Sequence, residues 1–156
     1  MIWPRILNTD APRATIIIRL MVGAVFLSEG VQKFLFPVER GVGRFTSIGL
    51  PAPEFLATWV AVWEIGAGTL ILVGLLTRPA AVAMIVNMMV AIAVTKLPML
   101  SADGFWTMAH ESRTDYSMLL GSAFLLLLGA GRWSLDAILV SATNRSSRPG
   151  GQRIPG

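Results

Sequence analysis

The chain of 156 residues is 54% hydrophobic and 14% charged, with 13 basic residues, 9 acidic residues, one His and no Cys. A soluble domain has roughly 45–50% apolar and 25% charged residues, so these charges are too few to cover a soluble fold. The composition predicts a membrane protein, and the missing Cys excludes disulfide, thiol and thiolate-bound metal chemistry.

Four apolar stretches follow one another along the chain, each of about 20 residues and long enough to cross about 30 Å of hydrocarbon as a helix. They cover residues 14–36, 55–76, 80–97 and 114–130. The breaks between them contain helix-breaking or turn residues at Pro37, residues 77–79, Pro98 and residues 129–131. The sequence therefore predicts an all-α integral membrane protein with a bundle of four transmembrane helices.

The regions outside the bundle differ in composition from the apolar stretches. Residues 1–13 are predicted to be a short N-terminal segment before the transmembrane domain of residues 14–131. Ser134 has the position of a helix cap, which predicts a short interfacial helix within residues 132–142. Residues 143–156 are rich in Ser, Pro, Gly and Arg, so we expect a disordered basic tail.

The basic residues divide unevenly between the two sides of such a bundle. With four spans, both termini and the turn at residues 77–79 lie on one side, which has eight basic residues against five on the other. The eight are Arg5, Arg13, Arg19, Arg78, Arg132, Arg145, Arg148 and Arg153. The positive-inside rule then places both termini in the cytoplasm. Anionic lipid accounts for the basic tail, so a nucleic-acid partner is not predicted.

Ionisable residues inside the predicted spans are functional candidates, because each costs about 2.5–3.5 kcal/mol on insertion scales. Glu29 and Lys33 lie one helical turn apart in the first span, and Glu64 lies near the middle of the second. Glu64 shares a face with small residues, so we expect it to point into the bundle. Asn87, on a similar face of the third span, is placed to hydrogen-bond with it.

A second polar group is expected where the third span ends and the fourth begins. Its members are Lys96, His110, Glu111, Arg113 and Asp115. From both groups the sequence predicts catalytic candidates at Glu64, Glu29, His110 and Asp115. Ligand-binding roles are predicted for Lys33, Asn87, Lys96, Trp63, Glu111 and Arg113.

Other interpretations of these residues stay open. Interlocking ion pairs can simply fix the register of the helices, and Trp63 can face either a cavity or lipid. His110, Glu111 and Asp115 are residue types that bind metals, but with a single His and no Cys we predict no metal site.

Several phrases carry a resemblance to a known family. They include Phe26-Leu27-Ser28-Glu29-Gly30, Trp63-Glu64-Ile65-Gly66-Ala67-Gly68, Gly74-Leu75-Leu76-Thr77-Arg78-Pro79 and Gly131-Arg132-Trp133-Ser134-Leu135-Asp136. In this order and on these spans, the chain resembles the DoxX family of small four-helix bacterial membrane proteins over about residues 14–140. The resemblance implies a location in the bacterial inner membrane.

The resemblance also implies a class of function. Some relatives are membrane subunits of thiosulfate:quinone oxidoreductase, and others belong to membrane-associated oxidoreductase complexes. We therefore predict a membrane subunit or anchor of a redox complex, with a quinone as the ligand of the polar pocket and a soluble or membrane redox protein as partner. The chain is expected to have no catalytic activity on its own.

Two alternatives belong to other functional classes. A small proton- or ion-coupled transporter would use the same carboxylates, and with only four spans it would need a homodimer. A non-catalytic scaffold would use residues 40–45 and 103–110 as a docking surface.

Overall fold

The structure is a computed structural model that describes Leu7 and residues 11–146. All regular elements among these residues are helices. They are α2 (Thr15–Leu35), α3 (Val42–Ser47), α4 (Pro53–Val73), α5 (Thr77–Ala91), the π-helical turn η1 (Ile92–Lys96), α6 (Leu97–Asp103), α7 (Phe105–Glu111), α8 (Arg113–Leu128) and α9 (Leu135–Ser146). The all-α prediction is confirmed for this part of the chain.

Three helices within the described residues are long and apolar enough to cross a membrane. They are α2 with 21 residues, α4 with 21, and the continuous helix α5–η1–α6 with 27. The fourth predicted span forms α8, whose 16 residues extend about 24 Å at 1.5 Å per residue. The length of α8 is thus less than the usual thickness of the hydrocarbon layer.

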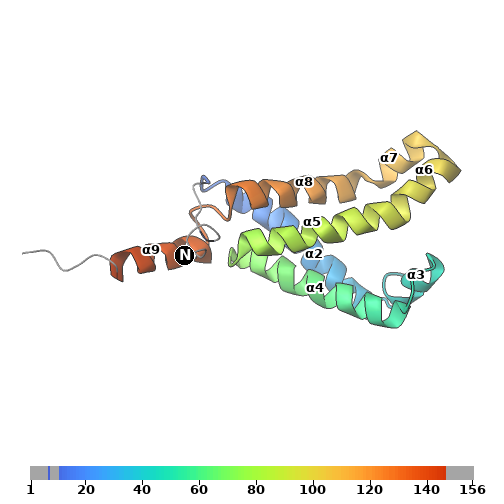
Figure 1. Ribbon diagram of the computed structural model, residues 1–156, viewed down its shortest axis with the longest axis horizontal. Helices are drawn as coiled ribbons and strands as arrows, with labels where there is room; N and C mark the ends of the chain where they lie inside the picture. Colours follow the sequence, from blue (N-terminus) through green and yellow to red (C-terminus); the bar gives the residue numbers. More distant parts are fainter. Residues whose placement is uncertain (1–6, 8–10, 147–156) are drawn as a thin grey trace, which may run out of the picture.

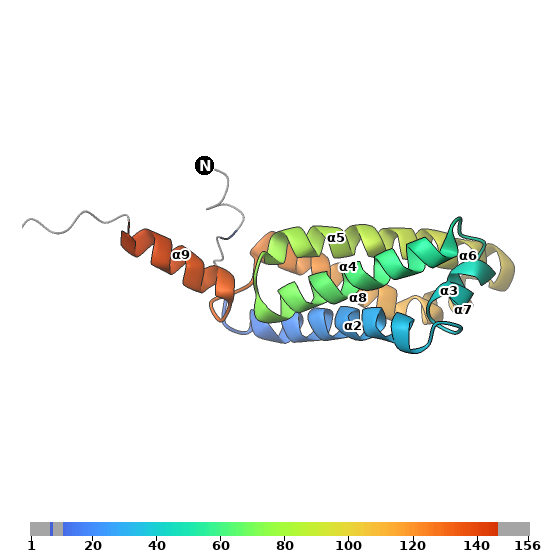
Figure 2. The same ribbon diagram turned by 90° about the horizontal axis from the view of Figure 1, so that it is seen from below.

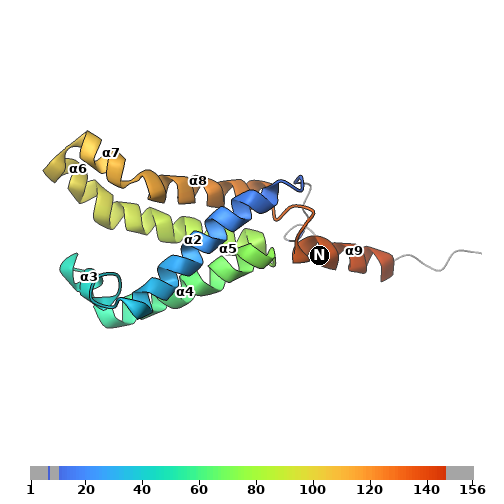
Figure 3. The ribbon, with the colours of Figure 1, turned by 180° about the vertical axis from the view of Figure 1, so that it is seen from behind.

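The long helices are arranged as two antiparallel pairs. Helix α2 packs along α4, and α5 packs along α8. Figures 1 and 2 show the pairs side by side near the start of α2, and Figure 1 shows them diverging toward α3 and α6. Seen from behind, α2 runs diagonally from the end of α8 to α3 (Figure 3). We call the end where α2 begins and α8 ends the closed end, and the α3 end the open end.

The apolar core fills the space between the pairs toward the closed end. Its largest fully buried side chains include Phe26 of α2, Ile71 of α4, Met84 of α5 and Leu125 of α8. Many other large apolar side chains on the same helices are more than one-third exposed, and these outward faces suit contact with lipid.

Helices α2 and α4 approach closely because each contributes glycine at the contact. A Cβ atom added at Gly68 would lie 2.7 Å from the backbone nitrogen of Leu27 and 2.9 Å from the carbonyl oxygen of Gly23. No side chain fits there without a shift of the backbone. Gly66, on the opposite face of α4, has nothing within 4 Å of the same position.

This contact gives a prediction with a matched control. Gly68→Ala is expected to destabilise the protein by about 1–3 kcal/mol, because the added methyl group forces the two helices apart. Gly66→Ala adds the same group in open space and should instead stabilise α4 by up to about 1 kcal/mol. Thermal unfolding of both variants in mild detergent, followed by circular dichroism, measures the difference. Equal midpoints for the two variants would contradict the close packing.

Two helix boundaries differ from the sequence prediction. The third stretch does not end at Pro98, since Pro98 lies in the first turn of α6 and the helix continues to Asp103. A proline is tolerated there because η1 precedes it and the first turn of a helix leaves its backbone N–H groups unpaired. The turn predicted at residues 77–79 lies instead at residues 74–76, with Gly74 and Leu76 in the left-handed region.

Buried polar side chains fix the closed end. Arg19 of α2 is 2% exposed and donates hydrogen bonds to the carbonyl oxygens of Ile71 at 2.9 Å, Leu72 at 2.5 Å, Trp133 at 2.5 Å and Ala130 at 3.4 Å. These carbonyls belong to the last turn of α4 and to the segment after α8. Arg19 was counted above with the basic residues of one membrane side, but it is an internal structural residue.

Asp136 completes the closed end from the start of α9. Its buried carboxylate accepts hydrogen bonds from the backbone nitrogens of Leu76 at 2.8 Å and Thr77 at 3.1 Å. A carboxylate at the N-terminus of α5 is favourable for the helix dipole. Together, Arg19 and Asp136 tie α2, α4, α5 and the segment after α8 to one another.

Helix α9 begins as the sequence predicts, because the hydroxyl oxygen of Ser134 accepts a hydrogen bond from the backbone nitrogen of Ala137. It is longer than predicted and includes residues 143–146, which were expected to belong to the disordered tail. Figures 1 and 2 show α9 extending away from the bundle. Residues 147–156 of the predicted tail and most of the predicted N-terminal segment lie outside the described residues.

Candidate functional site

A cavity of about 600 Å³ lies between the helix pairs on the side of the open end. Side chains from α2, α3, α4, α5, η1 and α8 line it. Phe26, Phe45, Met88 and Met118 form apolar walls and are buried. The volume falls within the range of small-molecule sites, which combine apolar walls with a few placed polar groups.

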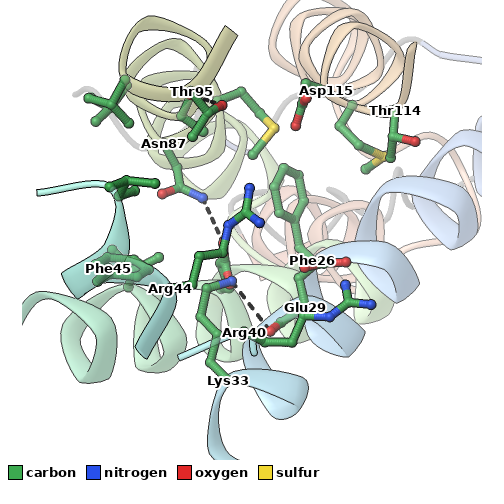
Figure 4. A pocket seen from close by; sticks show the side chains of 18 of the residues that line it. Phe26, Glu29, Lys33, Arg40, Arg44, Phe45, Asn87, Thr95, Thr114 and Asp115 are labelled. Atoms are coloured by element: carbon green, nitrogen blue, oxygen red, sulfur yellow. Dashed lines mark hydrogen bonds and ion pairs between the residues drawn. The ribbon is translucent and has the colours of Figure 1, made fainter. Parts of the chain in front are cut away.

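The floor of the cavity is a hydrogen-bonded group of three polar residues from three helices. Lys33 of α2 and Glu64 of α4 form an ion pair with 2.5 Å between Nζ and Oε2. Asn87 of α5 donates a hydrogen bond from Nδ2 to Oε1 of Glu64 at 3.0 Å. Glu64 is 3% exposed, so both of its oxygens are satisfied inside the protein. Figure 4 shows the side chains of Lys33 and Asn87 at the floor, each with a dashed line at its nitrogen.

A second polar group lines the wall formed by η1 and α8. Lys96 of η1 lies 3.3 Å from Oδ2 of Asp115 and donates a hydrogen bond to the backbone carbonyl of Glu111 at 2.9 Å. Lys96 is 9% exposed. A π-helical turn changes the angular position of the residues that follow it and is frequent at functional sites. Here η1 directs Lys96 toward α8.

The two ion pairs have the same structural relation to the bundle. Lys33–Glu64 joins α2 to α4, and Lys96–Asp115 joins the third helix to α8, so each pair stabilises one antiparallel helix pair. The hydrogen bond from Asn87 to Glu64 connects one helix pair with the other. The floor of the cavity is therefore also a polar contact between the two halves of the bundle.

Comparison with known proteins adds the family. The DoxX family model matches residues 14–97, which is more than half of the chain. The chain belongs to the DoxX family. The match includes α2, α4 and α5, and thus the whole Lys33–Glu64–Asn87 group.

Two curated relatives match most of the chain. It is 55% identical over 140 residues to the uncharacterized membrane protein Rv3486 of Mycobacterium tuberculosis, with 86% of each chain covered. It is 32% identical over 132 residues to the Bacillus subtilis protein named "Putative oxidoreductase CatD", covering 83% of this chain and 90% of that one. No solved structure matches the chain significantly. With three apolar helices of spanning length in the part of the chain that the structure describes, this DoxX protein is a membrane protein.

Most of the residues that the sequence singled out meet in this DoxX cavity. The seven that line it are Glu29, Lys33, Glu64, Asn87, Lys96, Glu111 and Asp115. Glu29, half-buried one turn before Lys33, accepts a hydrogen bond from Lys33 through its backbone carbonyl at 3.4 Å. Glu111 is exposed at the rim.

Three predicted site residues lie outside the cavity lining. Trp63 is 51% exposed and contacts Trp59 edge to face, with ring centroids 6.0 Å apart. His110 and Arg113 contact each other on the exposed surface, with 3.0 Å between Nδ1 of the His and a guanidinium nitrogen. We therefore leave Trp63, His110 and Arg113 out of the candidate site.

A further group of lining residues is not among the predicted site residues. Glu39, Arg40, Arg44 and Phe45 belong to the segment between α2 and α4, and they line the cavity from the open end. This segment entered the sequence analysis only as a docking surface. The sequence signal for this segment is Phe45, a large apolar residue with polar neighbours. Phe45 lies at helical spacing from residues 41 and 48, which predicts that these positions share one face of a short helix.

Proposed function

We propose that this DoxX protein is the membrane subunit of a redox complex and that its cavity binds a quinone head group. The observation that carries the proposal is the Lys33–Glu64–Asn87 group at the floor of a 600 Å³ cavity with apolar walls. A quinone has two carbonyl oxygens on a flat apolar ring. Lys33 and Asn87 supply N–H donors for such an oxygen, while Phe26 and Met88 offer apolar contact with the ring.

The same residues suit the proton transfers that accompany quinone reduction. Reduction of a quinone to a quinol consumes two electrons and two protons. Lys33 and Glu64 form an ion pair at the floor, and Lys96 and Asp115 form a second ion pair on the wall, so each pair offers a proton donor beside a proton acceptor. The electrons are assigned to a partner protein, and the oxidoreductase name of the Bacillus subtilis relative supports a redox setting.

The proposal includes a topology with four spans and both termini in the cytoplasm of a bacterial inner membrane. Arg13 before α2 lies over the ring of Trp133 after α8, at 5.6 Å, which supports an even number of crossings between them. The 16 residues of α8 would span a locally thinned bilayer. The basic residues that flank this end then meet the cytoplasmic surface. Residues 1–13 and 14–131 remain the proposed N-terminal segment and transmembrane domain, and the interfacial segment, predicted as residues 132–142, extends to residue 146 with the end of α9.

Quinone binding by the purified protein tests the proposal. We expect the full chain, in nanodiscs of neutral lipid, to bind 2-methyl-1,4-naphthoquinone, and Glu64→Gln to weaken that binding about tenfold or more. The substitution removes the charged acceptor that positions Lys33 and Asn87, and hydrogen bonds to charged groups contribute about 1.5–3 kcal/mol. Isothermal titration calorimetry gives both affinities.

Glu54→Gln is the matched control, because Glu54 is an exposed carboxylate on the same helix that does not line the cavity. Its affinity should equal that of the unmodified protein. The proposal fails if the unmodified protein binds no naphthoquinone, or if Glu64→Gln and Glu54→Gln bind it equally well. Circular dichroism of each variant establishes that it is folded before the titration.

A further inference from the structure

Two arginines line the cavity, and both are exposed. Arg40 and Arg44, from the segment between α2 and α4, reach into the cavity from the side of α3 (Figure 4). Lys33 and Lys96 each pair with a carboxylate. Among the described residues, by contrast, neither arginine side chain forms an ion pair or a hydrogen bond.

The cavity lining has five carboxylates and four basic side chains, but no carboxylate among the described residues forms an ion pair with either arginine. Glu64 and Asp115 are engaged by the two lysines. Glu29, Glu39 and Glu111 also line the cavity, and each lies beyond the 4.0 Å of an ion pair from both guanidinium groups. A planar guanidinium presents paired N–H donors that match a carboxylate or phosphate group in geometry and charge. Two such groups therefore lie exposed along the cavity, and no described residue accepts a hydrogen bond from either.

The other walls of the cavity limit the kind of molecule that could present a carboxylate or phosphate group to the arginines. Behind the arginines, the cavity is bounded by Phe26, Phe45 and Met118, so a ligand that fills it has an apolar or aromatic body. The carboxylate of Glu29, half-buried in the same wall, is an acceptor for a hydroxyl group of that body.

We propose that the cavity takes an anionic amphiphile, with its acidic group between Arg40 and Arg44 and its apolar body against the inner walls. This inference rests on the proposed function and gives the ligand class, an acidic quinone-type molecule. An anionic phospholipid of the surrounding membrane shares the same chemistry. The experiment separates these two sources.

The first arm compares two naphthoquinones that differ in charge. 2-Hydroxy-1,4-naphthoquinone is ionised at pH 7, whereas 2-methyl-1,4-naphthoquinone is neutral. In nanodiscs of phosphatidylcholine, the unmodified chain should bind the anion about tenfold more tightly than the neutral compound, as expected for charge-assisted hydrogen bonds. The double variant R40Q/R44Q should bring that ratio close to one. The control variant R113Q should keep the tenfold ratio, because it replaces an exposed arginine that lies at the same end but does not line the cavity.

The second arm tests lipid as the source of the anion. The same titrations are repeated with phosphatidylglycerol in the nanodiscs, and lipid retained after mild extraction is measured by mass spectrometry. If phospholipid occupies the site, the unmodified chain retains phosphatidylglycerol and loses its affinity for the anionic naphthoquinone, and R40Q/R44Q retains none. If an acidic quinone-type ligand is preferred, phosphatidylglycerol leaves the tenfold ratio unchanged.

The outcomes distinguish this inference from the proposed function. Naphthoquinone binding that is indifferent both to ligand charge and to R40Q/R44Q, with equal lipid retention, overturns the anion site and leaves quinone binding intact. Retention of phosphatidylglycerol that depends on the arginines, without any naphthoquinone binding, supports the anion site and overturns the quinone proposal. Absence of both kinds of binding overturns both.

Discussion

Lys33→Met is expected to lower the free energy of unfolding by about 3–5 kcal/mol, because it leaves the carboxylate of Glu64 buried without its cation. Glu64 is 3% exposed, and no other ion pair reaches it among the described residues. For a chain of this length, such a loss corresponds to a fall of roughly 10 °C in Tm. Thermal unfolding in mild detergent, followed by circular dichroism, measures it.

The double variant Lys33→Met/Glu64→Gln separates the cost of a broken ion pair from loss of lysine packing. Replacing both charges with neutral groups of similar size is often nearly neutral, so the double variant should recover most of the lost stability. Arg113→Met removes a surface cation and should leave Tm unchanged. A double variant as unstable as Lys33→Met would show that the ion pair is not the cause.

Arg19→Leu is expected to be destabilising to a similar degree, by about 3–6 kcal/mol, since it leaves several carbonyl oxygens without a donor at the closed end. The carbonyls of Ile71 and Leu72 belong to the last turn of α4, and of the two only that of Ile71 also accepts a backbone hydrogen bond, from Gly74 at 3.2 Å, so the arginine caps that helix. The four hydrogen bonds act together, and their contributions are not additive. Unfolding midpoints of the variant and the parent protein give the loss.

The variant Arg19→Lys tests whether the guanidinium group itself is needed for this cap. Lysine keeps the charge but reaches fewer carbonyls than the guanidinium fork, so its stability should fall between those of Arg19→Leu and the parent. Quinone binding by the folded fraction should be unchanged, because Arg19 lies at the end opposite the cavity. An Arg19→Leu variant as stable as the parent would contradict the capping role.

The sequence alone determined the helical class and the composition of the cavity floor. Stretches of apolar residues long enough to span a bilayer have few stable conformations other than a helix, because backbone polar groups must be satisfied internally. Once the helices are set, the 3.6-residue period places Glu64 among small residues and toward the bundle. The same reasoning brought Asn87 to it, and the structure adds Lys33, which the sequence placed only beside Glu29, as the ion-pair partner of Glu64.

The outward orientation of Trp63 also follows from the sequence. Adjacent residues of a helix differ by about 100° in direction, so Trp63 and Glu64 do not share a face. Its exposed position with Trp59 follows from that angle once Glu64 is known to face inward. The positions of His110 and Arg113 could not be predicted in this way. The end of α7 and the short connection to α8 orient them, and helical periodicity does not describe that turn.

Tertiary structure decided three features of the site. The π-helical turn η1 turned Lys96 toward Asp115, and a local change of hydrogen-bond register is not visible in an apolar pattern. The segment with Arg40 and Arg44 lines the cavity because Phe45 packs in a buried position against the bundle. Arg19 became a cap because the ends of α4 and α8 meet beside it. Local periodicity fixes which face of a helix turns inward, but only packing between distant segments fixes which side chains meet there.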